Sequence, residues 1–254
     1  MLPLLRVFGL TIQTPLLATI AGYMLGLMLS SRIGADRGMD GNAVSDAGFY
    51  GLIAGVLGAR AGYVLLNLQA YAREPLSALM PGTTALLPIA GWVTGVAFAV
   101  VYLRRKRLLT WQLLDVIAPG VALFLAGMAA GALLSGDAYG TEAQLPWSIY
   151  LWDAWRHPVQ VYEFISLLGI AAVLFVSLRR RFPDGVTVLL LIGLYAFTRV
   201  IVDAYRAEAV LLAGFRVTQL VGVVASVTSF LAIGGLKQEE NKSDMNPGEP
   251  KAPI

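Results

Sequence analysis

The stretch VTVLLLIGLYAFTRVIVDAY, residues 186–205, decides the fold class of this chain. It has the length needed to cross the hydrocarbon core of a bilayer, which takes roughly 20 residues of helix. It is almost entirely apolar, yet it carries Arg199 and Asp203. Charges inside a membrane are costly unless they are paired or hydrated, so a span that keeps them predicts a functional site.

The composition of the whole chain extends this prediction beyond one stretch. Of the 254 residues, 57% are hydrophobic and only 14% are charged, and the mean hydropathy is +0.69. A water-soluble domain of this length would need more polar surface to cover its core. We therefore predict an all-α, polytopic integral membrane protein.

About seven apolar stretches approach the spanning length, so we expect about seven transmembrane helices. These stretches are residues 11–31, 48–68, 84–103, 113–135, 158–178, 186–205 and 217–235. The fourth is interrupted by Pro119 and by several small residues. Residues 1–236 would form the helical domain, and the polar, proline-containing residues 237–254 a disordered cytoplasmic tail.

The distribution of lysine and arginine predicts how the spans are oriented. One set of loops contains runs of adjacent bases, and the opposite set contains only scattered single ones. The first set holds Arg32, Arg37, Arg104, Arg105, Lys106, Arg107, Arg179, Arg180, Arg181 and Lys237, and the second holds Arg6, Arg73, Arg156, Arg206 and Arg216. Because basic residues concentrate in cytoplasmic loops, we expect the N-terminus outside and the C-terminus in the cytoplasm.

This orientation puts residues 136–157 on the outer face of the membrane. The segment contains Trp147, Tyr150, Trp152 and Trp155, and such aromatic residues gather at headgroup depth. We therefore predict an interfacial element here, such as a short amphipathic helix.

The amino-acid types present also narrow the chemistry. The chain has no cysteine and one histidine, His157. Disulfides, thiolate metal sites, cysteine nucleophiles and multi-histidine metal sites are thereby excluded, and we expect no cofactor. Its basic residues lie in short clusters between apolar stretches, not on a basic face with aromatic readers, so we expect no nucleic-acid partner.

The sixth span carries four polar residues on one helical face. Tyr195, Arg199, Asp203 and Arg206 are spaced by four, four and three residues, so Arg199 and Asp203 can pair directly. Two interpretations fit this spacing. One is a structural salt bridge that holds helices together, and the other is an anion site where guanidinium groups clamp a phosphate.

The densest polar patch of the chain precedes and enters the fifth span, in RHPVQVYE, residues 156–163. Pro158 suits a first helical turn, which puts His157 at the helix mouth and Gln160 and Glu163 one turn further in. A lone histidine at a membrane interface can be a packing residue or a base, and the residues alone leave both open.

Two further charged residues fall within or beside predicted spans. Arg60 lies among small residues, with Gly58 and Gly62 beside it, which would allow close helix contact. Asp115, at the start of the fourth span, is expected to hydrogen-bond a helix end or a neighbouring helix. The basic clusters are expected to contact anionic lipid. A substrate with a phosphate headgroup would suit an arginine-lined cavity on the outer side.

Three segments together resemble the bacterial prolipoprotein diacylglyceryl transferase family. They are GARAGYVLL (58–66), RHPVQVYE (156–163) and the run of Tyr195, Arg199, Asp203 and Arg206. A fourth, SGDAYG (135–140), resembles another family pattern. The order of these segments, the number of spans, the orientation and the chain length also agree, so the resemblance covers nearly the whole chain.

The resemblance implies transfer of a diacylglyceryl group from phosphatidylglycerol to the lipobox cysteine thiol of an exported prolipoprotein. A multi-pass enzyme of the bacterial cytoplasmic (inner) membrane would perform it at the outer leaflet. The reaction needs a phosphate held and a thiol deprotonated. His157, oriented by Gln160 or Glu163, is the expected base.

The resemblance also assigns expected site residues. The catalytic set is His157, Arg199 and Tyr195, and the substrate-binding set is Arg60, Gln160, Glu163, Asp203, Arg206, Asp137 and Gly140.

The chain also departs from the family pattern at signature positions. Ala129 stands where the family has an arginine, Ala132 and Ser135 replace asparagines, and Ala90 replaces a histidine. A catalytically inactive homologue that binds lipid or serves as an accessory membrane protein is therefore an alternative. A small-molecule transporter is another, and it would have a helix broken near the bilayer midplane.

Overall fold

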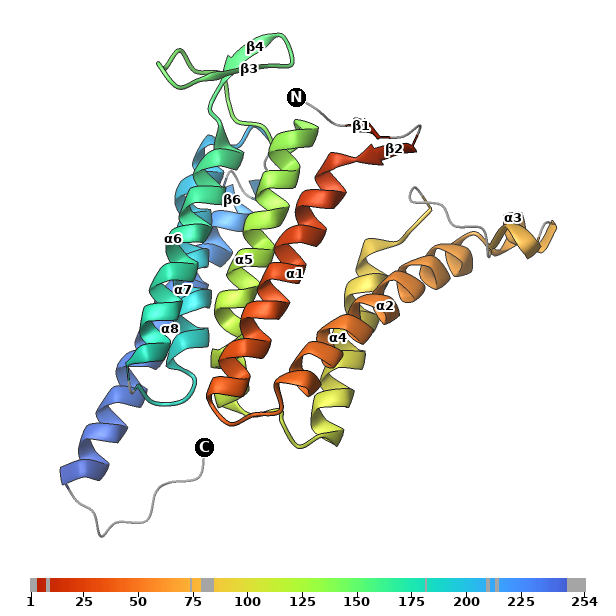
Figure 1. Cartoon of the computed structure of the whole chain (residues 1–254). Coiled ribbons are helices and arrows are strands. Elements are labelled where there is room, and N and C mark those ends of the chain that lie inside the picture. The colour runs from red at the N-terminus through yellow and green to blue at the C-terminus, as the bar shows by residue number, and fades with distance from the viewer. Residues whose placement is uncertain are drawn as a thin grey trace. The chain divides into compact units, whose positions relative to one another are not determined.

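The computed structural model describes residues 4–7, 10–73, 75–78, 85–180, 182–208, 211–212 and 215–245, and long helices dominate it (Figure 1). The chain divides into two compact units. Unit 1 consists of Met1–Leu29 and Leu114–Ile254, and unit 2 consists of Ser30–Leu113.

Over its described residues, unit 1 contains five long helices, one short 3-10 helix and three two-stranded sheets. Its elements are β1 (Leu4–Val7), β2 (Leu10–Gln13), most of α1 (Thr14–Asp36), α5 (Trp111–Ser135), β3 (Ile149–Leu151), β4 (Ala154–Arg156), α6 (Val159–Arg179), α7 (Val186–Val202), η2 (Asp203–Tyr205), β5 (Leu211–Leu212), β6 (Phe215–Arg216) and α8 (Val217–Met245). Unit 2 contains α2 (Gly41–Leu66), α3 (Leu68–Arg73), η1 (Pro75–Ala78) and α4 (Pro88–Arg105).

Six helices in the described part of the chain are long and apolar enough to cross a membrane. They are α1, α2, α5, α6, α7 continued by η2, and α8. Large apolar side chains such as Leu65, Leu66 and Leu231 are exposed on them, as a lipid-facing surface requires. The predicted all-α, multi-pass membrane protein is thus confirmed. The third predicted span corresponds to α4, whose 18 residues include Arg104 and Arg105 and which is not among the six. The count of seven and the orientation stay predictions.

Glycines set the distance between α2 and α4 in unit 2. A Cβ atom on Gly95 would lie 2.8 Å from the carbonyl oxygen of Gly51, and one on Gly91 would lie 2.9 Å from that of Gly55. The backbones therefore touch through two glycine pairs spaced four residues apart on each helix, a packing typical of membrane helices. A Cβ atom on Gly62, two residues after Arg60, would lie 2.5 Å from the Cβ atom of Ala90 in α4. The predicted close helix contact near Arg60 is therefore confirmed.

The same device joins α1 to α5 in unit 1. A Cβ atom on Gly22 would lie 2.7 Å from the Cα of Gly127, and one on Gly131 would lie 2.7 Å from the carbonyl oxygen of Pro15. Pro119 is fully buried inside α5 and does not end the helix. The small residues that interrupt the apolar pattern of this stretch are therefore its packing face.

Helices α5, α6 and α7 share an apolar core and one polar clamp. The core consists of Ala118, Ala122, Ile170, Ala171, Leu174 and Leu191. The Asp115 carboxylate accepts hydrogen bonds from the backbone N–H of Gly185 at 2.7 Å and of Val188 at 2.8 Å. These donors lie at the start of α7, where the first N–H groups of a helix lack partners within it. The prediction that Asp115 hydrogen-bonds a neighbouring helix is confirmed.

The segment 136–157 contains a β-hairpin where a short amphipathic helix was suggested, so that suggestion is wrong. β3 pairs with β4 through a two-residue turn in which Trp152 and Asp153 have φ of 52° and 60°. Aromatic and branched side chains favour strands, and a turn of this hand matches the twist of the hairpin. Trp147, Tyr150, Trp152 and Trp155 are all more than half exposed. Their predicted place at headgroup depth stays a prediction.

Helix α8 continues beyond the predicted end of the helical domain. It reaches Met245, so the tail predicted to be disordered from residue 237 is helical over its first part. The remainder, residues 246–254, lies outside the described residues.

Substituting Gly95 by leucine should lower the thermal stability of the purified protein. The new side chain would overlap the α2 backbone at Gly51, and overpacking of this kind costs about 1–3 kcal/mol. Gly169→Leu is the matched control, because Gly169 in α6 has nothing within 4 Å of an added Cβ atom. Thermal unfolding in detergent measures both, and equal melting temperatures would contradict the role given to the glycine pairs.

Candidate functional site

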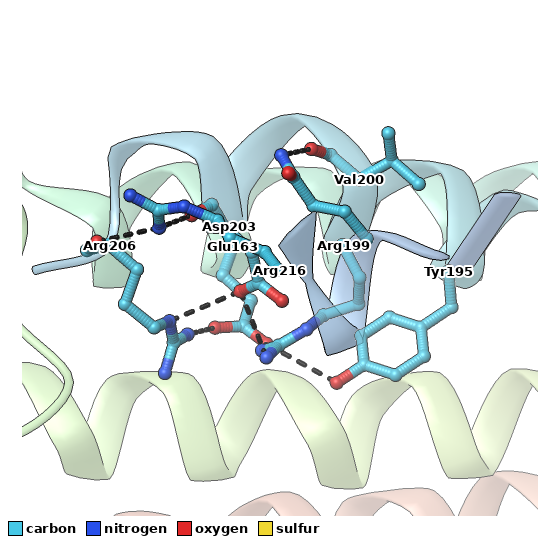
Figure 2. A network of polar contacts seen from close by, with 8 residues as sticks. Glu163, Tyr195, Arg199, Val200, Asp203, Arg206 and Arg216 are labelled. Atoms are coloured by element: carbon cyan, nitrogen blue, oxygen red, sulfur yellow. Dashed lines mark hydrogen bonds and ion pairs between the residues drawn. The ribbon is translucent and has the colours of Figure 1, made fainter. Parts of the chain in front are cut away.

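The carboxylate of Glu163 is the centre of a polar cluster built by α6, α7 and η2. Its Oε1 accepts hydrogen bonds from Arg199 Nη1 at 3.0 Å and from Tyr195 Oη at 3.3 Å. Its Oε2 accepts one from Arg206 Nη2 at 2.8 Å. Figure 2 shows this carboxylate with the two guanidinium groups and the tyrosine hydroxyl directed at it. The first turns of α6 are thereby tied to the last turns of α7.

Asp203 completes a closed ring with the same two arginines. Its Oδ1 lies 2.9 Å from Arg199 Nη2 and 3.2 Å from Arg206 Nε. Both contacts are ion pairs by distance, but neither is aligned as a hydrogen bond. The residue is 2% exposed, so the two guanidinium charges compensate a carboxylate that water does not reach. The predicted pairing of Arg199 with Asp203 is confirmed.

This alternating ring of Glu163, Arg199, Asp203 and Arg206 has no net charge. Each arginine contacts both carboxylates, so the two positive charges are matched one for one. The spacing of the sixth predicted span accounts for three members, because residues 199, 203 and 206 share a face. Glu163 comes from another helix, and its part in the ring depends on tertiary packing.

Arg216 is a site residue that sequence reasoning counted only as a loop base. It lies in β6, directly before α8, and its Nη1 donates hydrogen bonds to the backbone carbonyls of Asp203 and of Arg206, the latter at 2.8 Å. Figure 2 shows it beside the ring, next to Asp203. A signal existed in the sequence, since an arginine at the mouth of an apolar span is costly to place without a partner.

Gln160 and Gly140 shape the entrance to α6. Gln160 is 1% exposed, and its Nε2 donates to the backbone carbonyl of Asp137 at 2.8 Å. The Asp137 side chain itself is exposed. A Cβ atom on Gly140 would collide with the backbone carbonyl of His157 and lie 2.8 Å from Val159 Cγ2. Gly140 is therefore required by the close approach of the chain at the start of α6.

A short backbone ladder connects the charge ring to the hairpin. Thr141 N–H donates to the Tyr205 carbonyl at 2.7 Å, and His157 N–H donates to the Thr141 carbonyl at 3.0 Å. Gly140 also pairs with Arg206, and Glu142 pairs with Arg156. Residues 139–143 thus run between the end of α7 and β4, so His157 and the ring belong to one framework.

His157 is oriented by aromatic neighbours. Its Nδ1 lies 3.4 Å from Tyr162 Oη, which in turn accepts a hydrogen bond from Trp147 Nε1 at 2.8 Å. Its ring centroid lies 4.7 Å from that of Tyr205. The expectation that Gln160 or Glu163 orients His157 is wrong, because these side chains bond Asp137 and the two arginines instead.

Arg60 belongs to unit 2, where backbone carbonyls hold its guanidinium group. It donates to the carbonyls of Ser77 at 2.8 Å, Ala78 at 3.0 Å and Ala85 at 3.1 Å, and its Cζ lies 5.5 Å from the centroid of the Tyr71 ring. These contacts join the end of α2 to the segment before α4. The expectation that Arg60 shares a cavity with Arg199 and His157 stays a prediction.

Ala129, which stands at an arginine position of the family pattern, lies in an apolar environment. It is 5% exposed and clusters with Ala126 and Leu167, with Phe164 and Tyr195 packed against them. Helix α5 therefore contributes no charge at this point, although Tyr195 connects it to the ring.

The apolar helices and the buried ring of charges define a polytopic membrane protein with a polar site inside its helical unit. Comparison with known families then specifies it: the profile described as prolipoprotein diacylglyceryl transferase matches residues 3–234, and this chain belongs to that family.

Curated relatives resemble the chain over most of their length. A phosphatidylglycerol–prolipoprotein diacylglyceryl transferase of Synechococcus elongatus is 30% identical over 255 residues, which cover 92% of this chain and 88% of the relative. One of Finegoldia magna is 25% identical, with 94% of this chain and 96% of the relative covered. One of Clostridioides difficile is 23% identical, with 89% and 91% covered.

Removing the Glu163 carboxylate should destabilise the protein far more than removing an exposed one. Glu163→Ala leaves two partly buried guanidinium groups short of a partner, a loss of up to about 3–5 kcal/mol. The control is Glu142→Ala, because the Glu142 side chain is 73% exposed and 3.7 Å from Arg156, a contact worth at most about 1 kcal/mol. Thermal unfolding in detergent compares them, and a similar decrease for both variants would refute the buried ring.

Gly140→Ala should displace the His157 imidazole and thereby impair the site. The added methyl group would collide with the His157 backbone, so the imidazole and the start of α6 must shift. The histidine ring and its neighbours can be followed by NMR of the single histidine. An unchanged imidazole spectrum in a folded variant would show that Gly140 does not position His157.

Proposed function

We propose that this protein transfers a diacylglyceryl group from phosphatidylglycerol to the lipobox cysteine thiol of an exported prolipoprotein. The observation that carries the proposal is the convergence of Glu163, Tyr195, Arg199, Asp203 and Arg206 in one buried cluster. These are among the residues that carry the family resemblance, and curated relatives bear the name of this activity. The site of action would be the outer leaflet of the bacterial inner membrane.

The reaction exchanges one bond to a glyceryl carbon for another. The thiol sulfur forms a bond to that carbon, the bond from the carbon to the phosphate oxygen breaks, and glycerol phosphate leaves. The thiol proton passes to a base, and the departing phosphate takes the electron pair of the broken bond and gains one negative charge. Fixed positive groups that face this phosphate would stabilise the transition state, because they need no rearrangement as the charge develops.

His157 is the proposed base. Its Nδ1 faces Tyr162 Oη, and its Nε2 has no hydrogen-bond partner among the described residues. When Nδ1–H donates to Tyr162, Nε2 carries a lone pair that can take the thiol proton. Tyr162 thereby acts as the orienting group, and Trp147 fixes the tyrosine hydroxyl. Arg199 and Tyr195, which both donate to Glu163 Oε1, would hold the groups that face the phosphate in place.

Lipid binding without transfer is a second candidate function. It is favoured by the apolar packing of Ala129 at a position where the family pattern has an arginine. The transporter alternative has less support, since the six candidate spans are continuous helices over their described residues.

Complementation of a transferase-depleted bacterium tests the enzyme proposal. The unmodified chain should restore growth, and His157→Ala and Arg199→Ala should not, although all variants reach the membrane. Arg180→Ala is the control, because Arg180 is exposed beyond the end of α6. Label transfer from phosphatidylglycerol to a lipobox peptide tests the chemistry directly. A folded, lipid-binding protein that transfers no label would reject the enzyme and favour the lipid-binding function.

Tyr162→Phe should lower the maximal transfer rate and change its dependence on pH. The variant keeps the ring but removes the hydroxyl next to His157 Nδ1, so the imidazole loses the partner that sets its tautomer. The rate should fall without a matching rise in KM for phosphatidylglycerol. Unchanged rates across the pH range would exclude Tyr162 as the orienting group.

A further inference from the structure

The guanidinium groups of the site differ in what compensates their charge. Arg199 and Arg206 are shared between Glu163 and Asp203, so their positive charges are already matched within the ring. Arg216 forms no ion pair with any carboxylate of the described residues, and its two hydrogen-bond partners there are neutral carbonyl oxygens. The cluster as a whole therefore carries one positive charge in excess, and this charge is on Arg216.

The carbonyl contacts of Arg216 also orient its remaining hydrogen-bond donors. Only Nη1 is engaged, with the backbone oxygens of Asp203 and Arg206. Nε and Nη2 have no partner among the described residues. These two nitrogens form one edge of the planar guanidinium group, the edge that binds two oxygens of a phosphate or carboxylate side by side.

The unpartnered nitrogens of Arg216 are not among the fully buried polar atoms of the described residues. The residue is neither fully buried nor fully exposed, and it lies at the start of α8 beside η2. The nearest acidic residue along these contacts is Asp203, and its carboxylate is already matched by Arg199 and Arg206. An anion at Arg216 therefore gains an uncompensated positive charge without displacing either carboxylate of the ring.

We propose that Arg216 holds the phosphate of the lipid headgroup through Nε and Nη2, while Arg199 and Arg206 remain paired with Glu163 and Asp203. This inference rests on the proposed function, because it names the residue of that site that binds the phosphate. The ring would then position Arg216, because the two carbonyls that accept hydrogen bonds from its Nη1 belong to Asp203 and Arg206. The ligand class is a phosphate ester on a glycerolipid.

The test is equilibrium binding of phosphatidylglycerol to the purified full chain in detergent, with diacylglycerol as the phosphate-free lipid. Arg216→Gln should weaken phosphatidylglycerol binding by about tenfold or more, the loss of one charge-assisted contact. It should leave diacylglycerol binding unchanged. Arg216→Lys should fall between, because it keeps the charge but not the two-nitrogen edge. Arg180→Gln removes an exposed arginine elsewhere and should bind as the unmodified chain does.

A purely structural role for Arg216 makes a different prediction. As a clamp of two carbonyls alone, its loss would lower the melting temperature while the ratio of phosphatidylglycerol to diacylglycerol affinity stayed constant. That constant ratio in Arg216→Gln would overturn the proposal, as would an equal loss in Arg180→Gln. Reading the ratio in each variant keeps the test valid even where stability falls.

Inorganic phosphate and glycerol phosphate distinguish the sources of the anion. Competition by either against phosphatidylglycerol, lost in Arg216→Gln, would support phosphate recognition at this residue. A site that takes inorganic phosphate but not phosphatidylglycerol would overturn the lipid assignment. Because binding is measured without turnover, an Arg216-dependent affinity in a chain that transfers no label would reject the enzyme proposal and leave this inference standing.

Discussion

The rest of the site depends on a single electrostatic constraint: two arginines and two carboxylates at the junction of α6 and α7 must neutralise one another. None of the four could remain charged in an apolar environment alone, and each has both opposite charges within 3.2 Å. Glu163 fixes the first turns of α6 against the end of α7. Because a displaced charge in a low dielectric is costly, the four ion pairs constrain how α6 and α7 meet.

Neighbouring features of the site follow from that junction. Arg206 and Tyr205 anchor residues 139–143 through their backbones, and the same segment holds His157 and β4. The glycine at 140 allows the approach, and Arg216 closes the turn after α7 from the other side. The candidate base and the uncompensated arginine are therefore both placed by backbone contacts that originate at the ring. A change in any ring member should be transmitted to groups that it does not touch.

How much could be predicted from sequence depends on whether an interaction is local. Hydropathy predicted the membrane helices, and spacing predicted that Arg199 and Asp203 pair, because both depend on residues within one helix. The partners of Glu163 and His157 depend on which helices meet, and no spacing encodes that. Aromatic residues suit a hairpin or an interfacial helix equally well, so the composition of residues 136–157 does not distinguish the hairpin from the suggested amphipathic helix. Arg216 lies ten residues beyond Arg206, outside the range over which helical periodicity carries information.

The small residues at family positions change where positive charge can come from. Ala129 packs with Leu167 close to Tyr195, so α5 presents a methyl group where the family pattern has a guanidinium group. An anionic headgroup then requires a positive charge from another element. An arginine of the ring that bound the headgroup would leave a carboxylate of the ring unpaired. Arg216 meets this requirement from the start of α8, and it needs no rearrangement of Glu163 or Asp203 to do so. In the proposed arrangement, headgroup binding at Arg216 does not need an arginine on α5, and proton removal would depend on His157, the one histidine of the chain. The proposed phosphate-binding residue and the proposed base are therefore separable by mutation, because Arg216 precedes α8 and His157 precedes α6.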